Sequence, residues 1–102
     1  MEYSTVAQMF YGKINESTEK EVYFYKKGND WKGLTGRDIK NMVSKISLSL
    51  YSNDIKYQDR VAILSNTSYK WALCDYGVIC MGGVTTTVYP SLMPNQIKYI
   101  LN

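Results

Sequence analysis

Residues 60–88 read RVAILSNTSYKWALCDYGVICMGGVTTTV, and this stretch decides the fold class of the chain. Arg60–Ser65 is a short apolar run that favours a buried strand, and Val84–Val88 is a second strand rich in β-branched residues. Between them, an apolar segment of helical length ends at Gly82-Gly83, and glycine accepts the left-handed conformation common at helix ends. A strand, a helix and a strand within about thirty residues predict a βαβ unit with parallel strands.

The predicted central helix continues through residues 71–81 and is apolar nearly all round. Thr67 or Ser68 is placed to cap its first turn. We expect this helix to be covered on more than one side, since an apolar circumference is typical of buried helices. Asp75 interrupts it, and an isolated buried carboxylate is costly, so we expect Asp75 either to accept hydrogen bonds or to reach solvent.

Residues 89–102 predict the start of a further helix. Tyr89-Pro90 forces an extended exit from the preceding strand, and Pro94 suits the first helical position, with Gln96 in the first turn. The apolar face of this helix consists of Ile97, Ile100 and Leu101. In a doubly wound sheet the next element is another strand, so the pattern predicts an incomplete piece of a larger layered domain.

Upstream, Thr5–Ile14 has the apolar spacing of a short amphipathic helix. Glu21–Lys26 and Trp31–Leu34 predict a strand pair around a polar turn. Thr35 and Asp38 then form a capping-box-like start for a second helix. Its apolar stripe consists of Ile39, Met42, Val43, Ile46 and Leu50. The predicted fold class is therefore α/β: a parallel βαβ unit preceded by a short antiparallel strand pair and helices.

Composition narrows the function classes. The 102 residues allow one domain at most, and a hydrophobic content of 45% is that of a globular chain. The net charge is +3, and scattered lysines separated by acids form no basic stripe, so we expect no nucleic-acid partner. The segment 1–16 has Glu2 and no continuous apolar core, unlike a signal peptide, and residues 71–81 are too few to span a bilayer.

The chain contains no histidine, which excludes serine–histidine and cysteine–histidine catalysis and histidine-ligated zinc within it. It also lacks a Walker A loop, a GxGxxG fingerprint and a CxxC pair. Cys74 and Cys80 lie six residues apart, so on a helix they point to different sides and cannot bridge. We expect buried, reduced thiols and a cytoplasmic protein.

Residues 59–102 resemble the N-terminal region of AMP-forming acyl-CoA synthetases, especially the long-chain fatty acid type. The features that carry the resemblance are Asp59–Leu64, Asn66, Trp71, Gly82-Gly83-Val84, Tyr89-Pro90, and Ile97 with Tyr99-Ile100-Leu101. Trp31 with Leu34-Thr35 is similar to the family as well, and the region around Phe10 more loosely so. Gly36 and Met93 depart from the pattern, which usually has an aromatic residue at the first position and a Ser or Thr cap at the second.

The resemblance implies a large N-terminal α/β domain and a small mobile C-terminal domain in the full enzyme. It implies a two-step reaction, in which a fatty acid carboxylate attacks the α-phosphate of ATP to give acyl-adenylate and pyrophosphate. Coenzyme A then displaces AMP, and Mg²⁺ accompanies the ATP. The family holds phosphates with a Ser/Thr/Gly-rich loop ending near a lysine, and no stretch of this chain matches that loop.

We therefore expect no catalytic, cofactor-binding or metal residue within residues 1–102. Thr85-Thr86-Thr87 is explained by strand propensity rather than by phosphate binding, because the run contains no glycine. Trp71 and Tyr76 are more simply core residues than acyl-chain contacts. Residues 65–67 and 89–91 follow the carboxyl ends of the two parallel strands, where open α/β sheets bind ligands, but this argument rests on fold alone.

These observations predict that residues 1–102 are the N-terminal portion of the large domain of a long-chain fatty acid–CoA ligase, inactive alone. The full enzyme would use fatty acid, ATP and CoA, in the cytoplasm or peripherally at a membrane. Two alternatives stay open: another adenylate-forming ligase with a different acid, and a stand-alone non-catalytic α/β binding module. If the chain is a fragment, residues 61–88 should expose a sheet edge and apolar helix faces, and it should self-associate.

Overall fold

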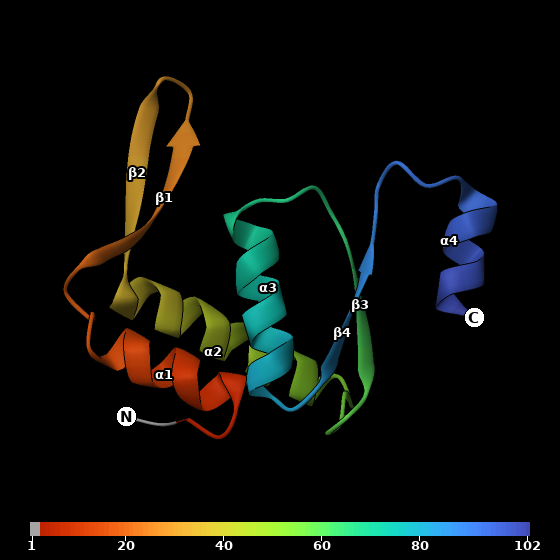
Figure 1. Cartoon of the computed structure of the whole chain (residues 1–102), viewed down its shortest axis with the longest axis horizontal. Helices are drawn as coiled ribbons and strands as arrows, with labels where there is room; N and C mark the ends of the chain where they lie inside the picture. Colours follow the sequence, from red (N-terminus) through yellow and green to blue (C-terminus); the bar gives the residue numbers. More distant parts are fainter. Residues whose placement is uncertain (1–2) are drawn as a thin grey trace.

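A computed structural model describes residues 3–102 and confirms the predicted α/β class (Figure 1). In chain order the elements are α1 (Val6–Asn15), β1 (Glu21–Lys27), β2 (Asp30–Thr35), α2 (Gly36–Ser52), β3 (Arg60–Leu64), α3 (Tyr69–Cys80), β4 (Val84–Val88) and α4 (Pro94–Leu101). Each predicted element is present, with ends displaced by one or two residues where they differ. Glu2, which entered the argument against a signal peptide, lies outside the described residues.

The βαβ unit forms as predicted. β3 and β4 pair in parallel, with Leu64 opposite Val88, and α3 connects them. Ser68 rather than Thr67 caps α3, because the Ser68 hydroxyl accepts the backbone N–H of Trp71 at 3.3 Å. Gly82 follows α3 with φ +85°, the left-handed conformation that glycine adopts without steric cost.

β1 and β2 form an antiparallel hairpin that projects beyond the helices (Figure 1). Gly28 adopts φ +64° in its turn, next to the last pair of the ladder, Lys27 opposite Asp30. Leu34 is buried near the base of the hairpin, and farther along the same face the Tyr25 ring stacks on Tyr69 of α3 with centroids 4.3 Å apart. The hairpin is thus anchored along one face while its turn is exposed.

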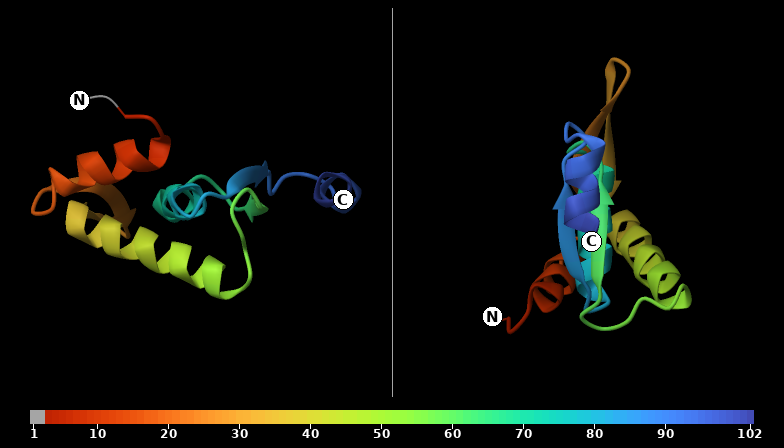
Figure 2. Two further views of the ribbon diagram at one scale, coloured as in Figure 1. Left: turned by 90° about the horizontal axis from the view of Figure 1, so that it is seen from below. Right: turned by 90° about the vertical axis from the view of Figure 1, so that its right-hand side faces the viewer.

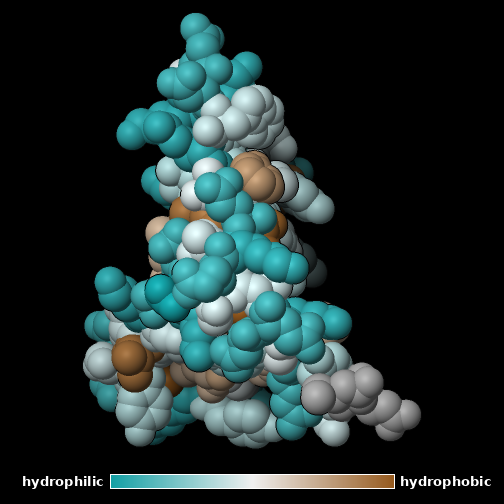
Figure 3. All heavy atoms as spheres, turned by 90° about the vertical axis from the view of Figure 1, so that its left-hand side faces the viewer, coloured by the Kyte–Doolittle hydropathy of each residue, from teal (hydrophilic) through white to brown (hydrophobic). Residues whose placement is uncertain are grey.

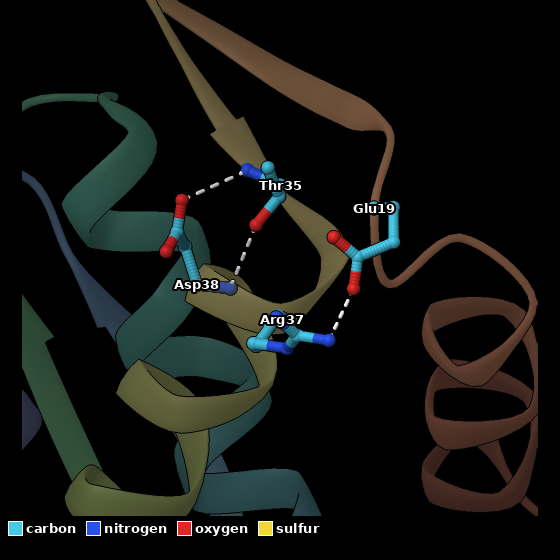
Figure 4. A network of polar contacts seen from close by, with 4 residues as sticks. All are labelled: Glu19, Thr35, Arg37 and Asp38. Atoms are coloured by element: carbon cyan, nitrogen blue, oxygen red, sulfur yellow. Dashed lines mark hydrogen bonds and ion pairs between the residues drawn. The ribbon is translucent and has the colours of Figure 1, made fainter.

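The start of α2 is a complete capping box (Figure 4). The Thr35 hydroxyl accepts the Asp38 N–H at 3.1 Å, and the Asp38 carboxylate accepts the Thr35 N–H at 3.0 Å. These two bonds satisfy amides that a helix start leaves without intrahelical partners. Beside them, Arg37 pairs with Glu19 of the α1–β1 connection. The sequence signal for this helix start is confirmed in full.

Gly36, a departure from the family pattern, has a steric reason. A β-carbon at this buried position would overlap the Ser17 carbonyl oxygen and lie 3.0 Å from the carbonyl oxygen of Ile14. The Gly36 N–H donates to the Ser17 and Lys20 carbonyls, at 3.1 and 3.0 Å. The α1–β1 connection therefore occupies the space that a side chain at this position would need.

α3 lies between two layers, with α1 and α2 on one side and the β3–β4 pair on the other (Figure 2). The main core lies where the helices and hairpin meet, and consists of Phe10, Ile14, Leu34, Ile39, Val43 and Leu73. The prediction that this helix is covered on more than one side is confirmed. The expectation that residues 61–88 expose apolar helix faces is wrong, because only Lys70 of α3 is exposed.

α2 and α3 approach each other closely at Gly77. A β-carbon there would overlap Ile46 Cγ2 and lie 3.7 Å from the Val43 carbonyl oxygen. The Ser47 hydroxyl donates to the Gly77 carbonyl oxygen at 2.7 Å, which fixes the two helices in register. Val43, Gly77 and Val78 are all buried. The absence of a side chain on Gly77 lets these helices touch along their backbones.

The molecule exposes more surface than a complete domain of its size. Its accessible area is 7618 Å², whereas a folded monomer of 11.7 kDa has about 5,900 Å². Its radius of gyration is 15.2 Å, against about 13 Å for a compact chain of this length. The excess lies partly at the β3–β4 sheet, where Leu64 and Val84 are 55% and 48% exposed. α4 lies apart from that sheet, with no buried residue (Figure 2).

We expect the 102-residue chain to self-associate through this uncovered sheet. Each of its two strands has one edge unpaired among residues 3–102, and such edges pair with other chains. Light scattering should give a mass above 11.7 kDa. Leu64→Lys should shift the chain toward monomer, whereas Tyr57→Lys, at a more exposed loop position outside the sheet, should not. A monodisperse wild-type monomer with a sharp two-state melt would contradict this expectation.

Gly77→Ala should lower the free energy of unfolding by about 1–2 kcal/mol, because overpacking against Ile46 outweighs the better helix propensity of alanine. Urea unfolding followed by circular dichroism, at low chain concentration, measures this cost. In an Ile46→Ala background the same substitution should cost less, since the overlapping methyl group is gone. Equal costs in the two backgrounds would show that the helices do not meet at Gly77.

Candidate functional site

The best candidate position for a site is the edge at which β3 and β4 both end. Since Leu64 pairs with Val88 in a parallel register, residues 65–67 and 89–91 leave the sheet side by side. All six residues are exposed. α3 begins close to the same edge, at Tyr69. The arrangement matches the position at which open α/β sheets bind ligands, as the sequence predicted from topology.

The side chains at this edge have limited chemistry. The Ser65 hydroxyl donates to the Asn66 carbonyl oxygen at 3.0 Å, and the Ser68 hydroxyl is used as the cap of α3. Asn66, Thr67 and Ser91 remain as exposed polar groups that can form hydrogen bonds with a ligand. Hydroxyl and amide groups without an adjacent base cannot act as activated nucleophiles. The edge can therefore contribute to binding but carries no catalytic constellation.

Thr85-Thr86-Thr87 lies inside β4, as expected from strand propensity. Thr87 is exposed, while the Thr85 hydroxyl oxygen is buried and has no hydrogen-bond partner among residues 3–102. A buried, unpaired hydroxyl costs about 1–3 kcal/mol. Because the Thr85 hydroxyl is buried, a phosphate group in solvent cannot reach it.

An apolar cavity of about 260 Å³ opens between α1, β1, α2 and α3. Its lining consists of Met9, Phe10, Lys13, Ile14, Val22, Tyr23, Ile39, Ala72, Leu73 and Tyr76. The Lys13 ammonium is the one charge in this lining, and it lies 3.8 Å from the Glu16 carboxylate. The sequence did not predict this cavity, because its walls come from four separate elements and no single motif contains them.

Tyr76 is a core residue, as predicted. Its ring stacks on Phe10 with centroids 4.5 Å apart, which connects α3 to α1. Trp71 is half-buried on the same helix. Asp75 is also half-buried, and no hydrogen bond or ion pair involves its side chain within the described chain, so it reaches solvent rather than a buried partner.

Cys74 and Cys80 are free thiols, as predicted, but both are half-buried rather than fully buried. Burial raises the pKa of the Cys80 thiol, and a hydrogen bond with Tyr11 partly opposes this effect. A thiol with a raised pKa carries less of the reactive thiolate, so Cys80 is not an activated nucleophile. Among residues 3–102, no group of three or more His, Cys, Asp or Glu side chains is placed to hold a metal ion. None of the described helices has the length and apolar character needed to cross a bilayer.

Residues 10–102 match the family described as AMP-binding enzyme. A relative with detectable sequence similarity is the long-chain-fatty-acid–CoA ligase FadD15 of Mycobacterium bovis, 27% identical over 100 residues. That alignment includes 98% of this chain but only 17% of the relative, so the chain spans about a sixth of the length of FadD15.

Two solved structures show the same fold. The anthranilate CoA ligase AuaEII, in complex with anthranoyl-AMP, superposes with a TM-score of 0.85 and 18% identity, over 97% of this chain and 18% of that one. The N-terminal subdomain of Klebsiella oxytoca NpsA gives a TM-score of 0.84 and 17% identity, over 97% and 25% of the two chains. With the family match over residues 10–102, this likeness confirms the resemblance drawn from the sequence, and the chain belongs to the AMP-binding enzyme family.

Proposed function

We propose that residues 1–102 are the N-terminal portion of the large domain of an ATP-dependent long-chain fatty acid–CoA ligase. The observation that carries this proposal is the family match over residues 10–102, together with similarity to FadD15, whose name specifies a long-chain fatty acid. The share of 17% of that relative's length is consistent with a chain that represents one part of a larger enzyme.

In this proposal the complete enzyme joins a fatty acid to ATP, releases pyrophosphate, and transfers the acyl group from AMP to coenzyme A. The described residues do not suit a magnesium or triphosphate site. They offer no carboxylate cluster, and the Ser65 and Ser68 hydroxyls are engaged within the backbone turn that follows β3. The proposed contribution of this chain is therefore structural: the βαβ unit positions the exposed sheet edge, and the reacting groups come from other parts of the enzyme.

Two other functions remain as outcomes to test. The first is an adenylate-forming ligase for a different acid, since AuaEII has the same fold and its name specifies anthranilate. The second is a stand-alone binding module. That alternative requires a closed core, and the excess surface and uncovered β3–β4 sheet weigh against it. The protein is proposed to act in the cytoplasm, or peripherally at a membrane.

The first measurement is the native coding sequence beyond codon 102. We expect it to continue into a Ser/Thr/Gly-rich loop followed by a lysine. The complete protein should then release pyrophosphate from ATP when palmitate is added, and form palmitoyl-CoA when coenzyme A and Mg²⁺ are present. Anthranilate and acetate, the control acids, should give little release. The isolated 102-residue chain, assayed in parallel, should give none.

Each contrary result identifies a different error. Faster pyrophosphate release with anthranilate than with palmitate would retain the adenylate-forming chemistry but overturn the long-chain assignment. A natural stop codon after Asn102 would rule out catalysis and favour the stand-alone module. Pyrophosphate release by the 102-residue chain itself would overturn the structural role proposed for it.

A further inference from the structure

An open hollow of about 370 Å³ lies between α2 and the first half of α3. Its lining consists of Met42, Lys45 and Ile46 from α2, and Tyr69, Lys70, Leu73 and Cys74 from α3. We name it the α2–α3 hollow. It contains no residue of the candidate sheet edge, and it shares only Leu73 with the apolar cavity between α1, β1, α2 and α3. The structural role proposed for this chain makes no use of it.

The floor of the α2–α3 hollow is apolar and held in place by the core. Leu73 is buried and Ile46 is half-buried. Tyr69 is fixed by its stacking on Tyr25 of the hairpin, with ring centroids 4.3 Å apart. Met42 is 37% exposed, and its unbranched, flexible side chain can adapt to an apolar group laid against it. The hollow can therefore take an alkyl chain without rearrangement of the two helices.

The charge at the hollow is positive and has no counter-charge in the lining. Lys45 and Lys70 are exposed, lie on different helices, and form no ion pair within residues 3–102. Lys70 is in the first turn of α3, which contains no acidic residue and where the helix dipole is also positive. Asp75, the nearest acid along α3, does not line the hollow. These features together favour an anionic group beside the two lysines.

An apolar floor beside two free ammonium groups fits a small amphiphile better than a protein layer. Protein–protein interfaces are depleted in lysine, because a covering protein must desolvate the charge. Lysine can instead lay its methylene stem along an apolar wall and keep its ammonium group in water. We propose that the α2–α3 hollow binds the alkyl chain of a single-chain anionic amphiphile, whose carboxylate or phosphate head binds Lys45 and Lys70. This inference does not depend on the proposed ligase activity.

Other apolar positions of the molecule have to be distinguished from this one. Seen from the side of the hairpin and α1, apolar side chains appear in small patches between hydrophilic ones (Figure 3). The apolar cavity has one charged lining group, Lys13, and it lies 3.8 Å from the Glu16 carboxylate. Cys74 lines the α2–α3 hollow but not that cavity, and Cys80 lines neither. The two thiols therefore report where an amphiphile binds.

Alkylation of Cys74 by N-ethylmaleimide tests the proposal on the 102-residue chain. Dodecanoate and dodecyl phosphate, each below its micelle-forming concentration, should slow the alkylation of Cys74 about fivefold or more at saturation, because the chain covers the thiol. Mass spectrometry follows Cys80 in the same sample, and its rate should change by less than about twofold. Dodecyltrimethylammonium lacks the anionic head, and acetate and inorganic phosphate lack the chain, so none of them should protect Cys74.

Substitutions in the hollow should weaken this protection. Lys45→Gln and Lys70→Gln should each raise the concentration of dodecanoate for half-maximal protection about threefold, and added salt should raise it further. Met42→Gln should raise it about fivefold if about 40 Å² of this side chain contacts the alkyl chain. The matched control is Lys98→Gln on α4, which removes the same charge elsewhere and should change it by less than about twofold. All four side chains are exposed, so the variants should remain folded, which circular dichroism checks.

Protection by either anionic probe supports the proposal, and the stronger of the two identifies the head as carboxylate or phosphate. Equal protection by dodecyltrimethylammonium would overturn it, because the head charge would then have no role. Equal protection of Cys80, or an equal effect of the Lys98 variant, would place the binding outside the hollow. Absence of protection by every dodecyl probe would also overturn the proposal.

Discussion

The contact between α2 and α3 at Gly77 is the constraint on which the other packing depends. Ile46 occupies the space where a side chain on Gly77 would lie, and the Ser47 hydroxyl holds the Gly77 carbonyl oxygen at 2.7 Å. This close approach leaves the opposite side of α3 free to support β3 and β4. If the two helices were spaced further apart, the core around Val43 and Leu73 would open, and the hairpin and α1 would lose the surface they pack on.

The parts of the fold that could be predicted from the sequence are those with local causes. Thr35 and Asp38 satisfy amides within one helical turn, so the start of α2 does not depend on distant residues. α3 ends before Gly82 because glycine, which has no β-carbon, adopts the left-handed φ of this position without steric cost. The βαβ unit follows from chain length and the alternation of apolar runs, and its parallel pairing is what the connecting helix requires. The family resemblance rested on the same residues 59–102.

The features that could not be predicted from the sequence depend on contacts between segments that are distant along the chain. The sequence predicted that α3 is covered on more than one side but not which elements cover it: α1 and α2 pack on one side and the strands on the other. Gly36 looked like a departure from a motif, and only the position of the Ser17 carbonyl explains it. The candidate sheet edge was located from topology, but hydrogen bonds such as that of Ser65 are decided by the local turn, so no site residue was predictable there. The apolar cavity gathers residues from four elements and has no linear pattern.

The unpartnered surface of the β3–β4 sheet is apolar, and this chemistry indicates what covers it. The β3–β4 sheet exposes Ala62, Leu64 and Val84 beside unpaired strand edges. Parallel sheets are stable when both faces are covered. This surface therefore requires further strands that pair with β3 and β4, or helices that pack over them.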